Sequence, residues 1–176
     1  MTFIENYLDI NGIILFFSKG FYDDRGVFAE ICNKEILNKI KIQIKQHNIS
    51  ISEKNVFRGM HLQTNPAMGK LIRCVSGEIT DYFLDLRKNS ETYGKYGSVT
   101  LKSPLASIWL PPGIAHGFIS HKDDTIVEYL CSEDYNRETD KTFKLKKLNL
   151  YSSDKYIISE KDRNAPDFDG FYFEGS

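Results

Sequence analysis

The chain has 176 residues, a formal net charge of −1 and an aromatic content of 13%. At this length we expect one domain over residues 1–176, and the near-neutral charge indicates neither a nucleic-acid nor a membrane partner. The first residues lack a signal-peptide pattern, and no apolar run is long enough to span a bilayer, so we expect a cytoplasmic location.

Short apolar runs separated by turn residues recur along the chain and predict a protein made mainly of β-strands. In chain order, the expected strands are Gly12–Ser18, Val27–Cys32, Lys41–Ser52, Val56–Leu62, Lys70–Val75, Glu78–Leu86, Gly97–Lys102, Ser107–Pro111, Gly117–His121, Thr125–Ser132 and Thr142–Leu150. One short helix is expected at Lys34–Ile40, with Asn33 as its N-cap. Many short strands at regular spacing favour an antiparallel sandwich or barrel.

The three cysteines are widely spaced and give no metal-binding or disulfide pattern. Cys32, Cys74 and Cys131 lie in apolar surroundings without a C-x-x-C spacing. We therefore expect all three to be small, buried, unpaired side chains.

A histidine lies close to cationic side chains in the segment Phe57–Gln63 and at Lys70. Histidine accepts a proton near neutral pH, and arginine and lysine bind phosphate groups. Strand alternation predicts that Phe57 and His61 face the same side, so that His61 faces the barrel interior if Phe57 does. The same rule places Tyr129 on an apolar face. Either residue alone is more often a satisfied core side chain, but their occurrence together with Arg58 and Lys70 indicates a site.

A second cluster, Pro111-Pro112-Gly113-Ile114-Ala115-His116, is similar to the second motif of the cupin barrel. Cupins often bind a metal through this histidine together with a His-x-His and a Glu of the first motif. Here the first motif reads His61-Leu62-Gln63, and no Glu follows before Gly69. Too few ligands remain for a catalytic metal, so we predict no metal site and a His61 that is available as a general base.

Seven motifs in order resemble those of the dTDP-4-dehydrorhamnose 3,5-epimerase family, and together they extend from Phe21 to Arg163. The motifs are Asp23–Glu30, Gln46–Asn48, Arg58–Gln63, Asp85–Gly94, Pro112–Phe118, Tyr129–Tyr135 and Ser159–Asp162. The resemblance implies an all-β, cupin-type jelly-roll barrel with a few short helices. It also implies a homodimer whose N-terminal strands are exchanged or paired between the subunits.

The activity implied by the resemblance is epimerisation at C3, C5 or both positions of a nucleoside-diphosphate 4-keto sugar, without a metal or organic cofactor. The sugar would be a dTDP-4-keto-6-deoxyhexose or a GDP-4-keto-heptose. By the same resemblance, His61 would be the general base, Asp162 its partner, Tyr129 the general acid and Lys70 the cation near the keto oxygen. The residues expected to bind substrate are Arg25, Phe28, Glu30, Gln46, Asn48, Arg58, His116 and Tyr135.

The chain departs from the family pattern in three places. Ala67-Met68-Gly69 stands where a glutamine is usual, and His47 replaces an aspartate. The lysine-rich segment Lys141–Leu148 lacks a tryptophan and is expected to be a solvated edge strand. These departures predict an altered pocket rim and a different nucleotide sugar. A nucleotide-sugar 3,4-ketoisomerase, a metal-dependent cupin enzyme and a non-catalytic sugar-nucleotide-binding protein remain as alternatives.

Overall fold

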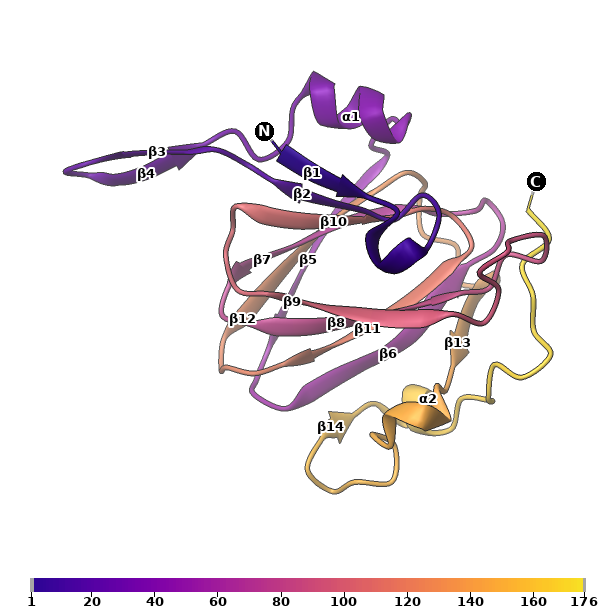
Figure 1. Ribbon diagram of the computed structural model, residues 1–176. Helices are drawn as coiled ribbons and strands as arrows, with labels where there is room; N and C mark the ends of the chain where they lie inside the picture. Colours follow the sequence, from indigo (N-terminus) through magenta and orange to yellow (C-terminus); the bar gives the residue numbers. More distant parts are fainter. Residues whose placement is uncertain (1, 176) are drawn as a thin grey trace.

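Two β-sheets face each other in the computed structural model, which describes residues 2–175 (Figure 1). The first sheet contains, in spatial order, β1 (Thr2–Glu5), β2 (Ile14–Phe17), β10 (Ala106–Leu110), β7 (Lys70–Ser76), β12 (Thr125–Cys131) and β5 (Gln46–Ser52). The second contains β13 (Asp140–Phe143), β6 (Val56–Gln63), β11 (Ile114–Ser120), β8 (Ile79–Asp85) and β9 (Tyr96–Leu101). Neighbours in these two sheet orders pair antiparallel, and apart from the consecutive pairs β1–β2 and β8–β9 they are distant in sequence, as in a jelly roll. The predicted fold class is confirmed.

The main core lies between the two sheets. Ile72 and Val127 from the first sheet pack with Phe83, Leu101 and Phe118 from the second, and all are almost completely buried. Alternation along each strand produces this core because every second side chain points inward.

The outer face of the second sheet is covered by the C-terminal part of the chain (Figure 1). This part contains η2 (Lys146–Leu148), β14 (Ile157–Ile158) and α2 (Glu160–Arg163). Met60 and Leu62 of β6 are buried there in a cluster with Phe143. The outer face of β6 is therefore apolar, and the covering segment brings α2 against this strand.

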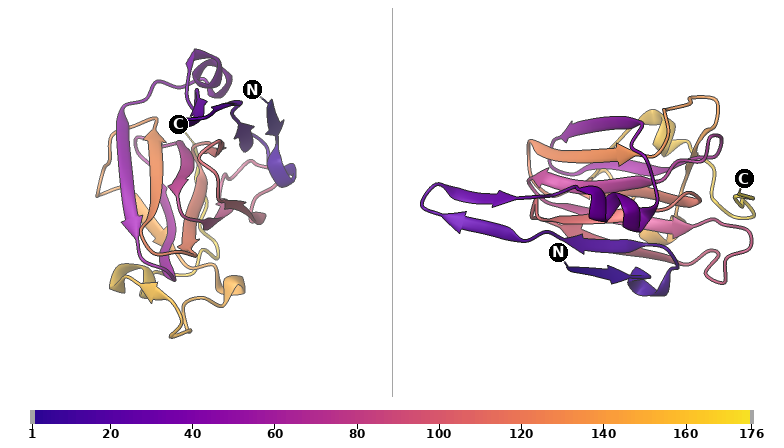
Figure 2. Two further views of the ribbon diagram at one scale, coloured as in Figure 1. Left: turned by 90° about the vertical axis from the view of Figure 1, so that its left-hand side faces the viewer. Right: turned by 90° about the horizontal axis from the view of Figure 1, so that it is seen from above.

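The N-terminal part provides a helix that packs on the first sheet and a hairpin that projects from the body (Figures 1 and 2). The hairpin consists of β3 (Gly20–Asp23) and β4 (Gly26–Ala29), and the short helix η1 (Tyr7–Asp9) lies between β1 and β2. Helix α1 (Lys34–Ile40) buries Ile36 and Ile40 against the sheet. None of the helices within residues 2–175 is both long and apolar enough to cross a membrane.

The predicted helix is confirmed, including its cap. The Asn33 Oδ1 atom accepts hydrogen bonds from the backbone N–H groups of Glu35 and Ile36, at 3.1 and 3.2 Å. The strand expected from Lys41 begins only at Gln46, because Lys41 ends the helix with a left-handed backbone (φ 55°).

Several other expected boundaries were wrong. The strand expected over Thr142–Leu150 ends at Phe143, after which the Lys144 N–H bonds the Pro166 carbonyl and η2 follows. Only the β13 part of the lysine-rich segment forms the expected edge strand. β11 begins three residues before Gly117, and the strand expected over Val27–Cys32 ends at Ala29.

All three cysteines are free, as predicted, but they differ in burial. Cys74 and Cys131 are buried in strands of the first sheet. Cys32 is only half-buried, because it lies in the connection between β4 and α1 rather than in a strand.

Candidate functional site

Side chains from both sheets line a cavity of about 610 Å³. His61 and His116 project into it from the second sheet, and Lys70 and Tyr129 from the first. An adjoining cavity of about 340 Å³ shares His61, Lys70 and Tyr129 with the first. The candidate site consists of these two cavities, and their combined volume is suited to binding a small molecule.

A β-bulge in β6 aims His61 into this site. His61 pairs with His116 and Arg58 pairs with Phe118, so two residues of β6 lie opposite the single residue Gly117. A Cβ atom on Gly117 would lie 2.5 Å from the carbonyl oxygens of Arg58 and Gly59, so the bulge requires glycine at that position.

The bulge also corrects the predicted alternation. Phe57 packs with Ile119 and Leu150 under the C-terminal segment, whereas His61 faces the cavity between the sheets. The two side chains therefore lie on opposite faces of β6. The expectation for His61 holds, but the inference that linked it to Phe57 was wrong because of the extra residue in the strand.

Asp162 lies beside His61. The Asp162 Oδ1 atom is 3.1 Å from Nε2 of His61, and its Oδ2 atom accepts a hydrogen bond from the Gly59 N–H at 3.0 Å. A Cβ atom at position 59 would lie 2.9 Å from Cγ of Asp162, so the absent side chain makes room for this carboxylate. The Ser159 hydroxyl caps α2 by accepting from the Asp162 N–H at 3.1 Å. Asp162 is thus held by backbone contacts and oriented toward the imidazole.

A second carboxylate lies on the other side of the imidazole ring. Oδ2 of Asp140 is 3.6 Å from Nδ1 of His61 and accepts a hydrogen bond from Lys161 at 2.8 Å. Burial alone would lower the pKa of His61, but Asp140 and Asp162 outweigh that effect and raise it. Burial would raise the pKa of Asp140, but hydrogen bonding to His61 and Lys161 lowers it to about 2.

Lys70 contacts His116 inside the cavity, and His116 in turn contacts a buried aspartate. Nδ1 of His116 lies 3.3 Å from the fully buried carboxylate of Asp81, and Nε2 lies 3.4 Å from Nζ of Lys70. If Nδ1 of His116 carries the proton, it donates to the Asp81 carboxylate, and Nε2 can accept a hydrogen bond from the Lys70 ammonium group. Burial lowers the pKa of His116, which favours this neutral form, and burial also lowers the pKa of Lys70.

Tyr129 projects from the sheet opposite His61. Its hydroxyl oxygen lies 2.8 Å from the Ser50 hydroxyl of β5. Burial raises the pKa of Tyr129, so its hydroxyl stays protonated at neutral pH. A proton acceptor, a proton donor and a cation therefore meet in one cavity, with acceptor and donor on opposite walls.

Three more predicted binding residues line these cavities, and a fourth supports two of them. Arg58 lines the larger cavity, and its Nε donates to the Ser52 hydroxyl at 3.1 Å. Asn48 and Tyr135 line the smaller cavity. Gln46 supports both, because its Nε2 donates to Oδ1 of Asn48 at 2.9 Å and its Oε1 accepts from the Tyr135 N–H at 2.6 Å.

Three other predicted binding residues lie outside both cavities. Arg25 and Phe28 belong to the projecting hairpin, and Glu30 follows it immediately (Figure 2). Within residues 2–175, Arg25 forms an ion pair only with Asp23 of its own turn, and its side chain is 90% exposed.

His47 does not alter the pocket rim as expected. Its Nε2 atom lies 2.8 Å from Oε1 of Glu128, which also pairs with Arg73. Glu128 alternates with the inward-facing Val127 and Tyr129, so this cluster lies on the outer face of the first sheet. The departure from aspartate at position 47 is therefore distant from the cavity, whereas Met68, in the Ala67–Gly69 segment, does line it.

Sequence reasoning missed Asp81, Asp140 and Lys161. Asp81 lies at an alternate position between the buried Ile79 and Phe83 of β8. An acidic residue on an otherwise apolar strand face is the signal that could have identified it. Lys161 lies within the Ser159–Asp162 motif, from which only Asp162 was predicted to be a site residue. No local signal marks Asp140, because its relation to His61 depends on the pairing of β13 with β6.

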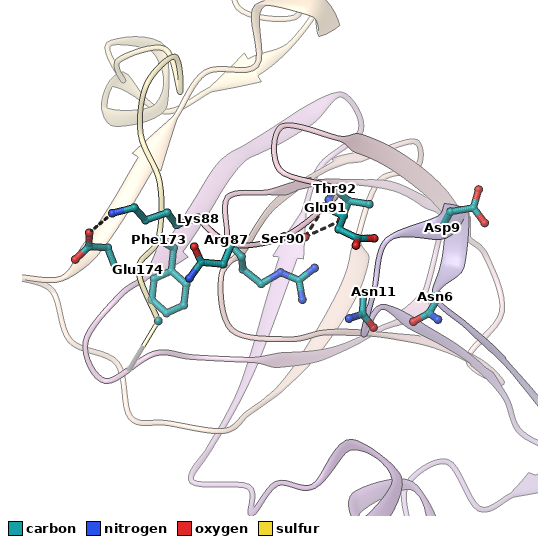
Figure 3. Close-up of a pocket in the computed structure, with 12 residues that line it drawn as sticks. Asn6, Asp9, Asn11, Arg87, Lys88, Ser90, Glu91, Thr92, Phe173 and Glu174 are labelled. Atoms are coloured by element: carbon teal, nitrogen blue, oxygen red, sulfur yellow. Dashed lines mark hydrogen bonds and ion pairs between the residues drawn. The ribbon is translucent and has the colours of Figure 1, made fainter.

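A separate cavity of about 740 Å³ lies between the η1–β2 segment, the β8–β9 loop and the C-terminal residues (Figure 3). None of the predicted site residues lines it. Its cations are already paired, Arg87 with the buried Asp85 at 2.7 Å and Lys88 with Glu174 at 2.8 Å. We therefore assign these contacts to stabilising the loop rather than to binding an anion.

No three His, Cys, Asp or Glu side chains of residues 2–175 are grouped so that they could hold a metal ion. The pairs His61–Asp162 and His116–Asp81 use their carboxylates on imidazole nitrogens instead. The groups in the cavity suit proton transfer to and from an anionic molecule.

Comparison with known proteins gives one consistent result. The family model described as dTDP-4-dehydrorhamnose 3,5-epimerase matches residues 7–170. The enzyme of that name from Methanothermobacter thermautotrophicus is 39% identical over 171 residues, which cover 92% of this chain and 91% of that protein.

Solved structures agree. The crystal structure of dTDP-4-dehydrorhamnose 3,5-epimerase from Sulfolobus tokodaii has a TM-score of 0.82 and 35% identity, covering 93% of this chain and 94% of that one. A dTDP-6-deoxy-D-glucose-3,5-epimerase from Legionella pneumophila, solved in complex with dTDP-4-keto-L-rhamnose, has a TM-score of 0.86 and 26% identity, covering 96% and 93%. The resemblance found in the motifs is confirmed: this chain belongs to the dTDP-4-dehydrorhamnose 3,5-epimerase family.

Proposed function

We propose that the protein inverts C3 and C5 of a dTDP-linked 4-keto-6-deoxyhexose, by removing and returning protons beside the ketone. The observation that carries this proposal is the position of His61 and Tyr129 on opposite walls of one cavity, with Lys70 projecting between the sheets. The printed names of the similar proteins, including the complex with dTDP-4-keto-L-rhamnose, support a dTDP-linked sugar over a GDP-linked one.

The ketone at C4 makes the hydrogens on C3 and C5 acidic, because the carbanion delocalises onto O4 as an enolate. His61 would take the hydrogen as a proton while the C–H electron pair moves into the enolate. Tyr129 would return a proton to the opposite face of the carbon, which inverts the centre. Its high pKa is no obstacle, because an enolate carbon is a strong base.

Lys70 would stabilise the negative charge that develops on O4. Its side chain is half-buried and its ammonium nitrogen lies 3.4 Å from Nε2 of His116, so the charge is already oriented before the reaction. Arg58, at the Val56–Arg58 end of the larger cavity, would bind the diphosphate.

The rate should fall in acid as His61 becomes protonated. A general base must be neutral to accept a proton, and the pKa of His61 is raised above its usual 6.5. We therefore expect kcat/KM to decrease as the pH drops through a pKa above 6.5. Measurement of kcat/KM between pH 5 and 9 would check this, and a profile with no acid limb above pH 6.5 would contradict it.

The nucleotide and the regiochemistry can be tested together. Product analysis by NMR with dTDP-linked and GDP-linked 4-keto sugars should show turnover of the dTDP substrate, with inversion at both C3 and C5. Inversion at one carbon alone would restrict the proposal to a monoepimerase, and turnover of only the GDP sugar would overturn the choice of nucleotide. No feature of the described chain favours the ketoisomerase, the metal-dependent enzyme or the non-catalytic binding protein.

We also propose a homodimer in which the β3–β4 hairpin completes the partner's cavity. A two-stranded hairpin is marginally stable alone, yet this one projects from the body with Tyr22 and Phe28 exposed by 75% and 69% (Figure 2). The edge strand β5 likewise exposes Ile49 and Ile51. A twofold partner would cover these apolar groups and bring Arg25 and Phe28 to a nucleotide.

Complementation between inactive variants tests this exchange. Arg25→Ala and His61→Gln chains should each be nearly inactive alone, but a mixed dimer would contain one intact cavity. Refolding them together should restore about one quarter of the wild-type activity, by random pairing of two chains in a symmetric dimer. If the hairpin instead serves its own chain, every cavity in the mixture carries a defect and activity should not return.

A further inference from the structure

The carboxylate of Asp140 joins three groups at the edge of the site. Its Oδ2 atom accepts from Nζ of Lys161 at 2.8 Å and from the Tyr135 hydroxyl at 3.4 Å, and it lies 3.6 Å from Nδ1 of His61. The Asp140 side chain is only 10% exposed, whereas that of Lys161 is 55% exposed. The nearly buried Asp140 carboxylate is therefore paired with a lysine that is itself largely exposed to solvent.

Nδ1, the ring nitrogen of His61 near Asp140, is the one that Asp162 does not contact. Oδ1 of Asp162 lies 3.1 Å from Nε2 of His61 and has no other partner among residues 2–175, so this carboxylate oxygen depends on the imidazole for compensation. Nδ1 is closest to the Thr142 hydroxyl, at 3.4 Å, and to Asp140. A substrate proton would thus arrive on the side of the ring that Asp140 faces.

Charged and titratable groups surround His61 from every element packed against it. They are Arg58 of β6, Lys70 of β7, His116 of β11, Tyr129 of β12, Asp140 of β13, Tyr135 of the loop before β13, and Lys161 and Asp162 of α2. The cations among them oppose formation of an imidazolium, as burial does. Without Asp140, only Asp162 near Nε2 would offset the effect of these cations and of burial on the protonated imidazole.

We propose that Asp140 is a second positioning residue for His61, which stabilises the protonated imidazole from the Nδ1 side while Lys161 holds the carboxylate in place. This inference rests on the proposed function, because it concerns the strength of the base that the reaction needs. It predicts opposite effects for the two partners. Loss of the Asp140 charge should make His61 a weaker base. Loss of the Lys161 charge should leave the Asp140 carboxylate less compensated and make His61 a stronger base.

The direct test is an NMR titration of the His61 ring in the free protein. Asp140→Asn should lower the pKa of His61 by about one unit, as expected for the loss of an opposite charge at this separation. Lys161→Met should raise it. The exposed Asp154→Asn serves as a matched control that removes the same charge outside both cavities and should leave the titration unchanged.

Shifts of opposite sign would support the inference. An unchanged titration in Asp140→Asn, or shifts of the same sign in both variants, would overturn it. Lys161→Met changes a largely exposed side chain, so its result stands even if Asp140→Asn folds poorly.

Activity provides an independent reading. The acid limb of kcat/KM should move with the titration, to lower pH in Asp140→Asn and to higher pH in Lys161→Met. If the titrations shift as expected but no 4-keto sugar is turned over by the wild type, the proposed function fails while the role of Asp140 stands. If turnover occurs but the titrations do not shift, only the role of Asp140 fails.

Discussion

Replacement of His61 by glutamine should lower kcat by about 10³-fold, within the range usual for loss of a general base. Glutamine keeps polar contacts to Asp162 but cannot accept the substrate proton. The measurement is the steady-state rate of product formation, together with the rate at which solvent deuterium enters the substrate. Both should fall by the same factor, since no other step can proceed without deprotonation.

His121→Gln provides a matched control for this variant. His121 lies outside both cavities, where its Nε2 atom is 2.7 Å from the Thr80 hydroxyl, so the same chemical change should leave kcat close to that of the wild type. Full deuterium exchange by His61→Gln would contradict the assignment of the base. Loss of activity in both variants would indicate a general effect on folding.

Replacement of Tyr129 by phenylalanine should separate proton removal from inversion. The ring would keep its packing against the main core, but the hydroxyl that returns the proton would be lost. We expect inverted product to fall by about 10²-fold or more, while His61 still exchanges substrate hydrogen with solvent and restores the original configuration. Product NMR and deuterium incorporation, measured in the same reaction, distinguish the two processes.

Tyr82→Phe is the control for this variant, because Tyr82 is a half-buried tyrosine that packs on the outer face of the second sheet. It should leave both rates unchanged. Equal loss of exchange and inversion in Tyr129→Phe would assign Tyr129 a binding role instead of the acid role. Normal inversion would remove it from the mechanism.

Local patterns predicted much of this fold because their causes are local. Helix α1 follows from the Asn33 cap and from Ile36 and Ile40, which recur at helical spacing. The inward position of Tyr129 follows from strand alternation with Val127 and Cys131.

The contacts that complete the site depend on distant parts of the chain. The bulge at Gly59 shifts the register of one strand, and the Gly59 N–H bonds a carboxylate 103 residues later in the sequence. Asp140 reaches His61 only because β13 pairs with β6, and no periodicity at Asp140 reports that pairing. Alternation predicts which face a side chain takes in a regular strand, but it does not predict where a strand gains a residue.

The most direct test of the central claim is to incubate the wild type with the dTDP-linked 4-keto-6-deoxyhexose in D₂O and to locate deuterium by NMR. If His61 removes protons beside the ketone and Tyr129 returns them, deuterium should appear at both C3 and C5 of the inverted sugar, and His61→Gln should abolish it. Inverted product that retains its original hydrogens, or a wild type that incorporates no deuterium at either carbon, would contradict the account.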